Sequence, residues 1–215
     1  MLIAVVITFL DPDIQVNPYL ILAGMGVGAT VGSLIALKVK MTSIPEMVAL
    51  FNGFGGLATF FIAWSEFNSV PDNTFQYVLI MLTTYIGGVT FSGSIVAYGK
   101  LSEKLKIQKT SIITKFFTTI FYVSIIYLIY SILISNIFIP PFDFFIVLLA
   151  LTLLGGIGFV IPIGGGDMPV VISLLNSFSG IAAAFAGLLL LNNVLIVAGS
   201  LVGASGLILT VIIAK

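Results

Sequence analysis

The sequence predicts an all-α protein, a polytopic bundle of about seven transmembrane helices. Of its 215 residues, 60% are hydrophobic and only 7% are charged, whereas about a quarter of the residues in a typical soluble domain are charged. The mean hydropathy is +1.27. So few charges cannot cover a water-exposed surface, and the long apolar stretches suit a ~30 Å hydrocarbon core. We therefore expect residues 1–215 to form a single transmembrane domain in a lipid bilayer.

The composition also excludes several kinds of chemistry. The chain has no cysteine and no histidine, which excludes disulfides, thiolate catalysis and iron–sulfur ligation and removes the usual metal ligand and neutral-pH proton carrier. The formal net charge is zero, and no basic patch indicates nucleic-acid binding. We predict no metal site.

The apolar stretches define the spans in order. The first, Met1–Leu10, is too short to cross and lacks the basic start and cleavage site of a signal peptide. We interpret it as a shortened or truncated segment, followed by a loop at Asp11–Asn17. Seven full spans are then predicted: Pro18–Leu37, Ile44–Phe67, Phe75–Tyr98, Ile112–Ser135, Phe142–Ile163, Met168–Leu191 and Val194–Ala214.

The lysines predict the orientation. If the spans cross alternately, every cationic residue falls on one side: Lys38, Lys40, Lys100, Lys104, Lys106, Lys109, Lys115 and Lys215. The opposite side receives Asp11, Asp13, Glu66, Asp72 and Asp143. The positive-inside rule makes the lysine side cytoplasmic, in a prokaryotic plasma membrane or, alternatively, an organellar inner membrane. We interpret the lysines of the loop Gly99–Ser111 as a topology signal rather than a binding site.

An internal repeat relates two parts of the chain. The residues Pro45, Val48, Leu50, Asn52, Phe54 and Gly56 recur in register as Pro169, Ile172, Leu174, Asn176, Phe178 and Gly180. This pattern predicts two parallel three-helix repeats, residues 18–98 and 142–214, with a site at their interface. The alternative is chance similarity between apolar sequences.

The stretch from Asp167 to Gly180 places one amide deep in the membrane. Asp167 is predicted to cap this helix, with Pro169 tolerated in the first turn. Asn176 follows nine residues later, roughly 13 Å deeper at ~1.5 Å per residue, which is near the bilayer midplane. By the repeat, Asn52 lies at the same depth. An amide there is costly without a partner or water, so both asparagines are functional candidates.

Three further patterns each have two interpretations. Ser43 and Glu46 have the spacing of a capping box, or Glu46 is a carboxylate at the cytoplasmic mouth. Thr83, Gly87, Thr90 and Ser94 form a stripe of small and polar residues that either packs against a helix or lines a water path. The glycines of the last span, Gly199, Gly203 and Gly206, indicate close packing or a flexible helix near a gate.

Two negative results limit the function. Gly24, Gly26 and Ala29 match a dinucleotide fingerprint by letter, but they lie in an apolar span with no preceding strand. The deep parts of all spans lack Asp, Glu, Lys, Arg and His. A proton path would therefore have only Asn52, Asn176, hydroxyl groups and water, none of which titrates near neutrality. A titrating residue would have to come from another chain.

Four stretches resemble the membrane domain of the β subunit of the proton-translocating NAD(P)⁺ transhydrogenase. They are PEMVA from Pro45, GVTFSGSIVAYGKL from Gly88, GDMPVVISLLNSFSG from Gly166 and LIVAGSLVGASG from Leu195. The resemblance covers nearly the whole chain. It implies coupling of inward proton movement to hydride transfer between NADH and NADP⁺. The rival function is a small-solute or ion transporter with its site between the repeats. A purely structural anchor would leave the paired asparagines unexplained.

The resemblance also implies roles for individual residues. Asn176 matches a proton-channel asparagine, and Ser94 matches a serine that lines the channel. Asp167 matches an aspartate that communicates with the NADP-binding domain, and Glu46 is assigned to the same coupling. Asn52 stands where many members carry the channel histidine and others carry asparagine. The three glycines of the last span match the glycine-rich helix that leads into the NADP-binding domain.

The same resemblance implies partners. NAD binds to the α subunit, and NADP binds to a soluble domain that follows this membrane domain in the family, whereas this sequence stops at Lys215. We therefore expect no catalytic residue and no bound nucleotide in this chain alone. The expected partners are an α subunit whose membrane helix supplies a histidine, an NADP-binding domain or chain, and a second copy in a dimer of complexes.

Overall fold

The computed structural model describes residues 18–69, 71, 73–105, 112–135 and 141–215. In these residues every regular element is a helix, and seven helices are long and apolar enough to cross a membrane. The predicted fold class is thereby confirmed. Several predictions fall outside the described residues, namely those on Met1–Leu10, the loop Asp11–Asn17, Asp72, Lys106 and Lys109.

The helices follow the predicted spans to within a few residues. They are α2 (Pro18–Lys38), α3 (Ile44–Asn68), α4 (Thr74–Leu101), α5 (Ile112–Ile134), α6 (Phe142–Val160), α7 (Met168–Leu189) and α8 (Asn193–Ile213). The helix α6 ends three residues before the predicted Ile163. Pro162 explains this early end, because it has no backbone N–H with which to extend the hydrogen-bond ladder.

The chain separates into two compact units, residues 1–42 and 43–215. The first contains α2, which starts at Pro18 and has Lys38 in its last turn, where a cation complements the helix dipole. The hydroxyl of Thr30 donates to the carbonyl of Gly26 at 2.8 Å. Gly24 and Gly26 therefore lie inside a helix and not at a strand-to-helix turn, so their spacing is no dinucleotide fingerprint.

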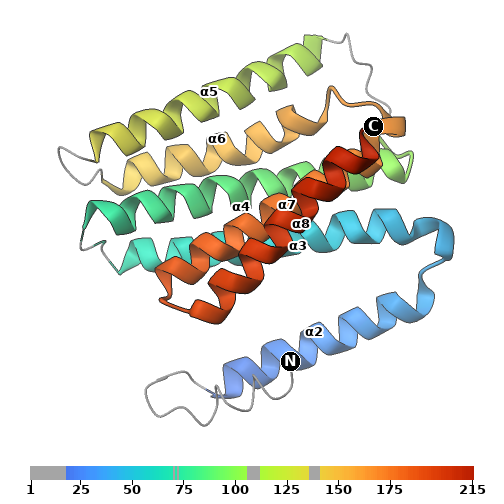
Figure 1. Ribbon diagram of the computed structural model, residues 1–215, viewed down its shortest axis with the longest axis horizontal. Coiled ribbons are helices and arrows are strands. Elements are labelled where there is room, and N and C mark those ends of the chain that lie inside the picture. The colour runs from blue at the N-terminus through green and yellow to red at the C-terminus, as the bar shows by residue number, and fades with distance from the viewer. Residues whose placement is uncertain (1–17, 70, 72, 106–111, 136–140) are drawn as a thin grey trace. The chain divides into compact units, whose positions relative to one another are not determined.

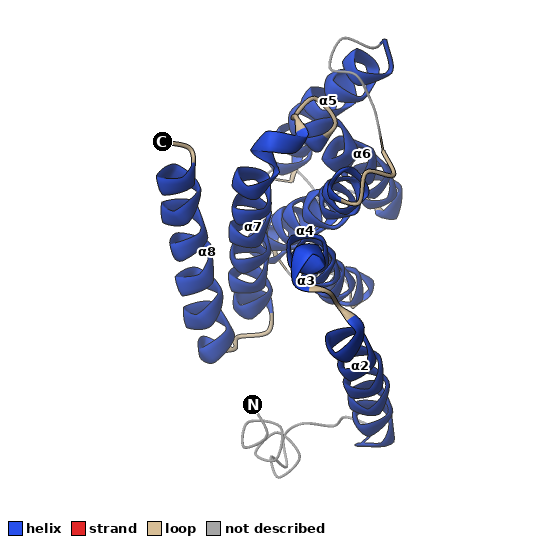
Figure 2. Cartoon of the chain, turned by 90° about the vertical axis from the view of Figure 1, so that its right-hand side faces the viewer, coloured by secondary structure: helices blue, strands red, loops and turns tan. Residues whose placement is uncertain are grey.

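In the second unit, α4 is the central and most buried helix. It packs against α3, α6 and α7, while α5 lies against α6, and α8 lies against α7 (Figures 1 and 2). One buried cluster joins α3, α4, α6 and α7 through residues such as Ala49, Ala97, Val160 and Met168. The starts of α3 and α7 and the ends of α4, α6 and α8 therefore lie at the lysine-bearing end of this unit.

Two glycines bring α3 and α4 into close contact. A Cβ added at Gly56 would lie 2.7 Å from the carbonyl oxygen of Gly87, and one added at Gly87 would lie 2.7 Å from that of Gly56. The neighbouring Thr83 and Thr90 hydroxyls donate to carbonyls of their own helix, at 2.8 and 2.6 Å. This part of the predicted stripe therefore packs against a helix, as its spacing predicts.

Short 3₁₀ turns precede both asparagine-bearing helices, η1 (Met41–Ser43) before α3 and η2 (Gly165–Asp167) before α7. The turns start 124 residues apart, as do the helices that follow them and the helices α2 and α6 that precede them. The matched boundaries agree with the repeat seen in the sequence. We retain the duplication as a proposal.

Candidate proton path

Asn52 joins α3 to α7. Its side chain is 9% exposed, and its Nδ2 donates to the backbone carbonyl of Ile172 at 3.3 Å. In an α-helix this carbonyl is also the acceptor for the N–H of the residue four positions later, which is Asn176. The two predicted asparagines therefore lie one helical turn apart on facing helices.

Asn176 borders a cleft between α3, α7 and α8. The cleft has a volume of about 420 Å³, and its lining includes Pro45, Val48, Ser173 and Leu209. The side chain of Asn176 is half-buried and forms no hydrogen bond with the described residues. Its amide is thus available to water or to a partner group in the cleft.

A second cleft follows along the same three helices, farther from the lysine-bearing end. Its volume is about 250 Å³, and its lining includes Gly55, Ser179, Ala183 and Leu195. Neither cleft has a charged residue in its lining.

Ser94 is buried against α3 rather than exposed to the Asn176 cleft. A Cβ added at Gly53, the residue after Asn52, would lie 3.1 Å from the Cβ of Ser94. Ser94 is fully buried, yet its Oγ has no hydrogen-bond partner among the described residues. Buried hydroxyls are normally satisfied, so this oxygen is an exception in the part of the chain that the structure describes, and it lies close to Asn52.

The predicted caps at both helix starts are wrong. Neither Ser43 nor Asp167 makes a side-chain cap hydrogen bond. Both residues end a 3₁₀ turn with ψ near zero, whereas a capping residue is normally extended. In addition, Pro45 and Pro169 occupy the second helical position and have no N–H to donate. Asp167 is consequently exposed on the lysine-bearing side.

Glu46 is also placed differently from the prediction. It lies half-buried in the first turn of α3. The predicted capping box between Ser43 and Glu46 does not form, because Ser43 makes no cap hydrogen bond. Its interpretation as a carboxylate at the cytoplasmic mouth remains a prediction.

The three glycines of α8 pack tightly on α7. A Cβ at Gly199 would lie 2.5 Å from the backbone N of Ala184, and one at Gly206 would lie 2.8 Å from the Cβ of Ser177. The Ser177 hydroxyl donates to the carbonyl of Gly203 at 2.6 Å. Close packing therefore accounts for the glycines, while their predicted role in gating stays a proposal.

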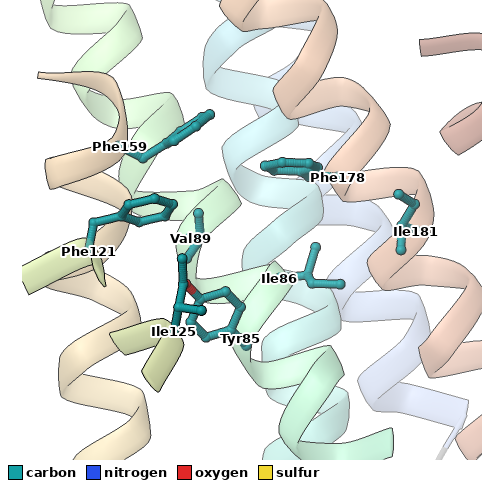
Figure 3. Close-up of a pocket in the computed structure, with 8 residues that line it drawn as sticks. All are labelled: Tyr85, Ile86, Val89, Phe121, Ile125, Phe159, Phe178 and Ile181. Carbon is teal, nitrogen blue, oxygen red and sulfur yellow. The ribbon is translucent and has the colours of Figure 1, made fainter. Parts of the chain in front are cut away.

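A separate crevice lies among α4, α5, α6 and α7 (Figure 3). Its volume is about 180 Å³, and aromatic rings of Phe121, Phe159 and Phe178 border it. The hydroxyl of Tyr85, also in the lining, lies 3.2 Å from the Oγ of Ser124. Apolar cavities of this kind stay dry, so this crevice is unsuited to protons.

The described residues fit neither a metal ion nor a nicotinamide dinucleotide. They contain no group of three His, Cys, Asp or Glu side chains that could hold a metal. The clefts present no cation to a pyrophosphate. What the region around Asn52 and Asn176 offers is amide and hydroxyl groups, which orient water without titrating.

Sequence reasoning missed three polar residues. Ser173 and Ser177 hold α8 against α7, because the Ser173 hydroxyl donates to the carbonyl of Gly206 at 3.1 Å. Their four-residue spacing opposite the glycines of α8 was the available signal. Lys100, interpreted only as part of a topology signal, binds backbone carbonyls at the end of α6.

Comparison with known proteins supplies the family. The family model for the NAD(P) transhydrogenase beta subunit matches residues 1–215. The chain belongs to the NAD(P) transhydrogenase beta-subunit family. Two curated proteins named NAD(P) transhydrogenase subunit beta, from Rhodospirillum rubrum and a named strain of it, are each 35% identical to the chain over 224 residues. The match covers 100% of this chain and 47% of each relative, so the chain spans about half the length of these transhydrogenase subunits.

Proposed function

We propose that this chain is the proton-translocating membrane part of an NAD(P)⁺ transhydrogenase. In this proposal, hydride transfer between NADH and NADP⁺ occurs on partner nucleotide-binding domains, and the bundle conducts the coupled proton. The observation that carries the proposal is the hydrogen bond from Asn52 of α3 to the Ile172 carbonyl of α7, one turn before Asn176, which itself borders an open cleft. Membership of the transhydrogenase family supplies the reaction class.

The proton moves along water held by side chains of this chain. Asn176 orients water in the cleft, Asn52 fixes the α3–α7 contact, and the unpartnered Oγ of Ser94 binds a water beside Asn52. None of these groups stores a proton at neutral pH. They position the water wire and lower the cost of having polar atoms at the midplane.

A partner membrane helix supplies the titrating group, a histidine whose charge changes in the working pH range. The Asn176 cleft is a suitable place for this imidazole, because the cleft opens between α3 and α8 and exposes an amide without a partner among the described residues. Asp167 and Glu46, at the cytoplasmic ends of α7 and α3, then respond to the state of the NADP-binding domain.

Reconstitution tests the proposal. The chain is assembled with its α-type partner and NADP-binding domain in proteoliposomes, and internal pH is followed during hydride transfer. We expect proton movement that stops when either nucleotide is omitted. Hydride transfer without any proton movement would contradict the proposal. Proton-independent solute uptake by the chain would instead favour the transporter.

Cross-linking tests the position of the partner helix. The chain has no native cysteine, so a single Val48→Cys variant reports on the rim of the cleft. We expect it to cross-link to cysteines placed next to the partner histidine. The matched control is Val147→Cys on α6, a residue equally exposed, at 44% against 42% for Val48, but outside the cleft. Equal cross-linking at both positions would contradict the placement.

A further inference from the structure

Lys100 lies in the last turn of α4 but binds the end of α6. Its Nζ donates to the backbone carbonyls of Val160 at 3.1 Å, Ile161 at 2.5 Å and Ile163 at 2.6 Å. The last four carbonyls of a helix have no partner within it. A lysine ammonium has three donors, and its acceptors here include Val160, the last residue of α6, and Ile161 and Ile163, which follow it. Lys100 therefore binds the end of α6 and the residues that follow it, although it belongs to α4.

The segment bound by Lys100 packs against the start of α7, next to Asp167. Val160 and Ile161 are buried in the same cluster as Ala97 of α4 and Met168, the first residue of α7. Met168 is fully buried, and the residue before it is the exposed Asp167. The end of α4, the end of α6 and the start of α7 are thus packed together, with the carboxylate of Asp167 at their exposed edge.

The other described lysines at this end differ from Lys100. Lys115 is exposed in the first turns of α5, and Lys104 lies over the ring of Tyr98, with its Nζ 5.6 Å from the ring centroid. A lysine that only sets topology must place its charge on the cytoplasmic side, but it does not need a fixed partner. The carbonyl contacts of Lys100 therefore indicate a second role.

We infer that Lys100 is a positioning residue that ties α4 to the end of α6 and the residues that lead into the turn carrying Asp167. This inference rests on the proposed function and deepens it. Ser94 lies six residues before Lys100 on the same helix, about 9 Å away at ~1.5 Å per residue. When the NADP-binding domain displaces the Asp167 turn, the contact between Lys100 and the end of α6 passes the displacement to α4, and so to Ser94 and Asn52.

The local part of the inference is tested with a nitroxide label at Gly165→Cys. Gly165 is exposed, and a Cβ added there meets no atom within 4 Å, so the label does not disturb the turn. The measurement uses the assembled complex with cysteine-free partners. We expect Lys100→Met to increase label mobility, and Lys100→Arg, which keeps the charge and the donors, to preserve it. The control Lys115→Met should leave the spectrum unchanged.

The functional part is tested by the number of protons moved per hydride transferred. We expect Lys100→Met to lower this ratio about fivefold or more, the lower end of typical coupling between sites, and Lys100→Arg to restore most of it. A merely structural role would lower proton movement and hydride transfer together and leave their ratio unchanged. If Lys100→Met does not accumulate, Lys100→Leu, which also has neither donors nor charge, replaces it under the same criteria.

Two results would overturn the inference: unchanged label mobility in the neutral variant, or an unchanged proton-to-hydride ratio. Failure of the proposed function looks different, because the parental complex would then move no protons during hydride transfer. In that case the label spectra still decide whether Lys100 holds the turn.

Discussion

Replacement of Asn52 by leucine separates a small effect on stability from a large effect on function. The change removes the only side-chain hydrogen bond between α3 and α7 in the described residues, the one to the carbonyl of Ile172. That carbonyl keeps its intrahelical partner, the N–H of Asn176, so no acceptor is orphaned. Side-chain hydrogen bonds between membrane helices contribute about 0.6 kcal/mol on average and ~1.7 kcal/mol at most. Leucine has the same number and branching of side-chain heavy atoms as asparagine, so we expect a loss of unfolding free energy below about 2 kcal/mol.

The expected effect on proton movement is much larger. Leucine has no polar group to orient water, so the chain of water molecules is interrupted beside Asn176. We therefore expect the rate of proton translocation to fall at least about tenfold, which corresponds to ~1.4 kcal/mol. Unfolding in detergent gives the stability, and internal pH in proteoliposomes gives the flux. The matched control is Thr152→Val on α6, because this buried hydroxyl donates to Leu149 of its own helix at 2.9 Å. A folded Asn52→Leu variant with proton flux within about twofold of the parental protein would refute the reasoning.

Two further predictions concern the carboxylate of Asp167 and the orientation of the spans. Asp167→Asn should leave the unfolding free energy within about 0.5 kcal/mol of the parental value, as for other surface substitutions, because the exposed carboxylate makes no cap hydrogen bond. We expect the variant to lose proton-linked hydride transfer. Normal coupled activity would contradict the proposed role of Asp167 in coupling. Cysteine labels at Ser102 and Asn73 should be accessible only from the cytoplasmic and only from the opposite side, respectively. Reaction of both from one side would contradict the assigned orientation.

The sequence predicted the spans well because each span is a long apolar run bounded by charged or turn residues. It also predicted that the two asparagines lie at matching depth, which stays a prediction. The repeat puts them at equal depth, and the structure shows Asn52 bonded to the carbonyl one turn before Asn176. Such placement depends on helical periodicity alone, which is readable from a single chain.

The caps and the lysine contact were not predictable in the same way. Ser43 and Asp167 have the side chains of caps, but the 3₁₀ turns before them set a backbone conformation in which the cap bond does not form. Lys100 is one of several lysines at the lysine-bearing end, and its partner Val160 on α6 is sixty residues away in sequence. Only tertiary packing distinguishes it from a lysine that sets topology.

The most direct test of the account replaces each membrane histidine of the partner subunit with alanine in the reconstituted complex. Because the described spans of this chain contain no group that titrates near neutrality at the depth of Asn52 and Asn176, we predict that at least one replacement abolishes proton translocation. We also predict that Asn52→His in this chain partially restores it. Proton translocation at the parental rate in every histidine variant would contradict a shared proton path.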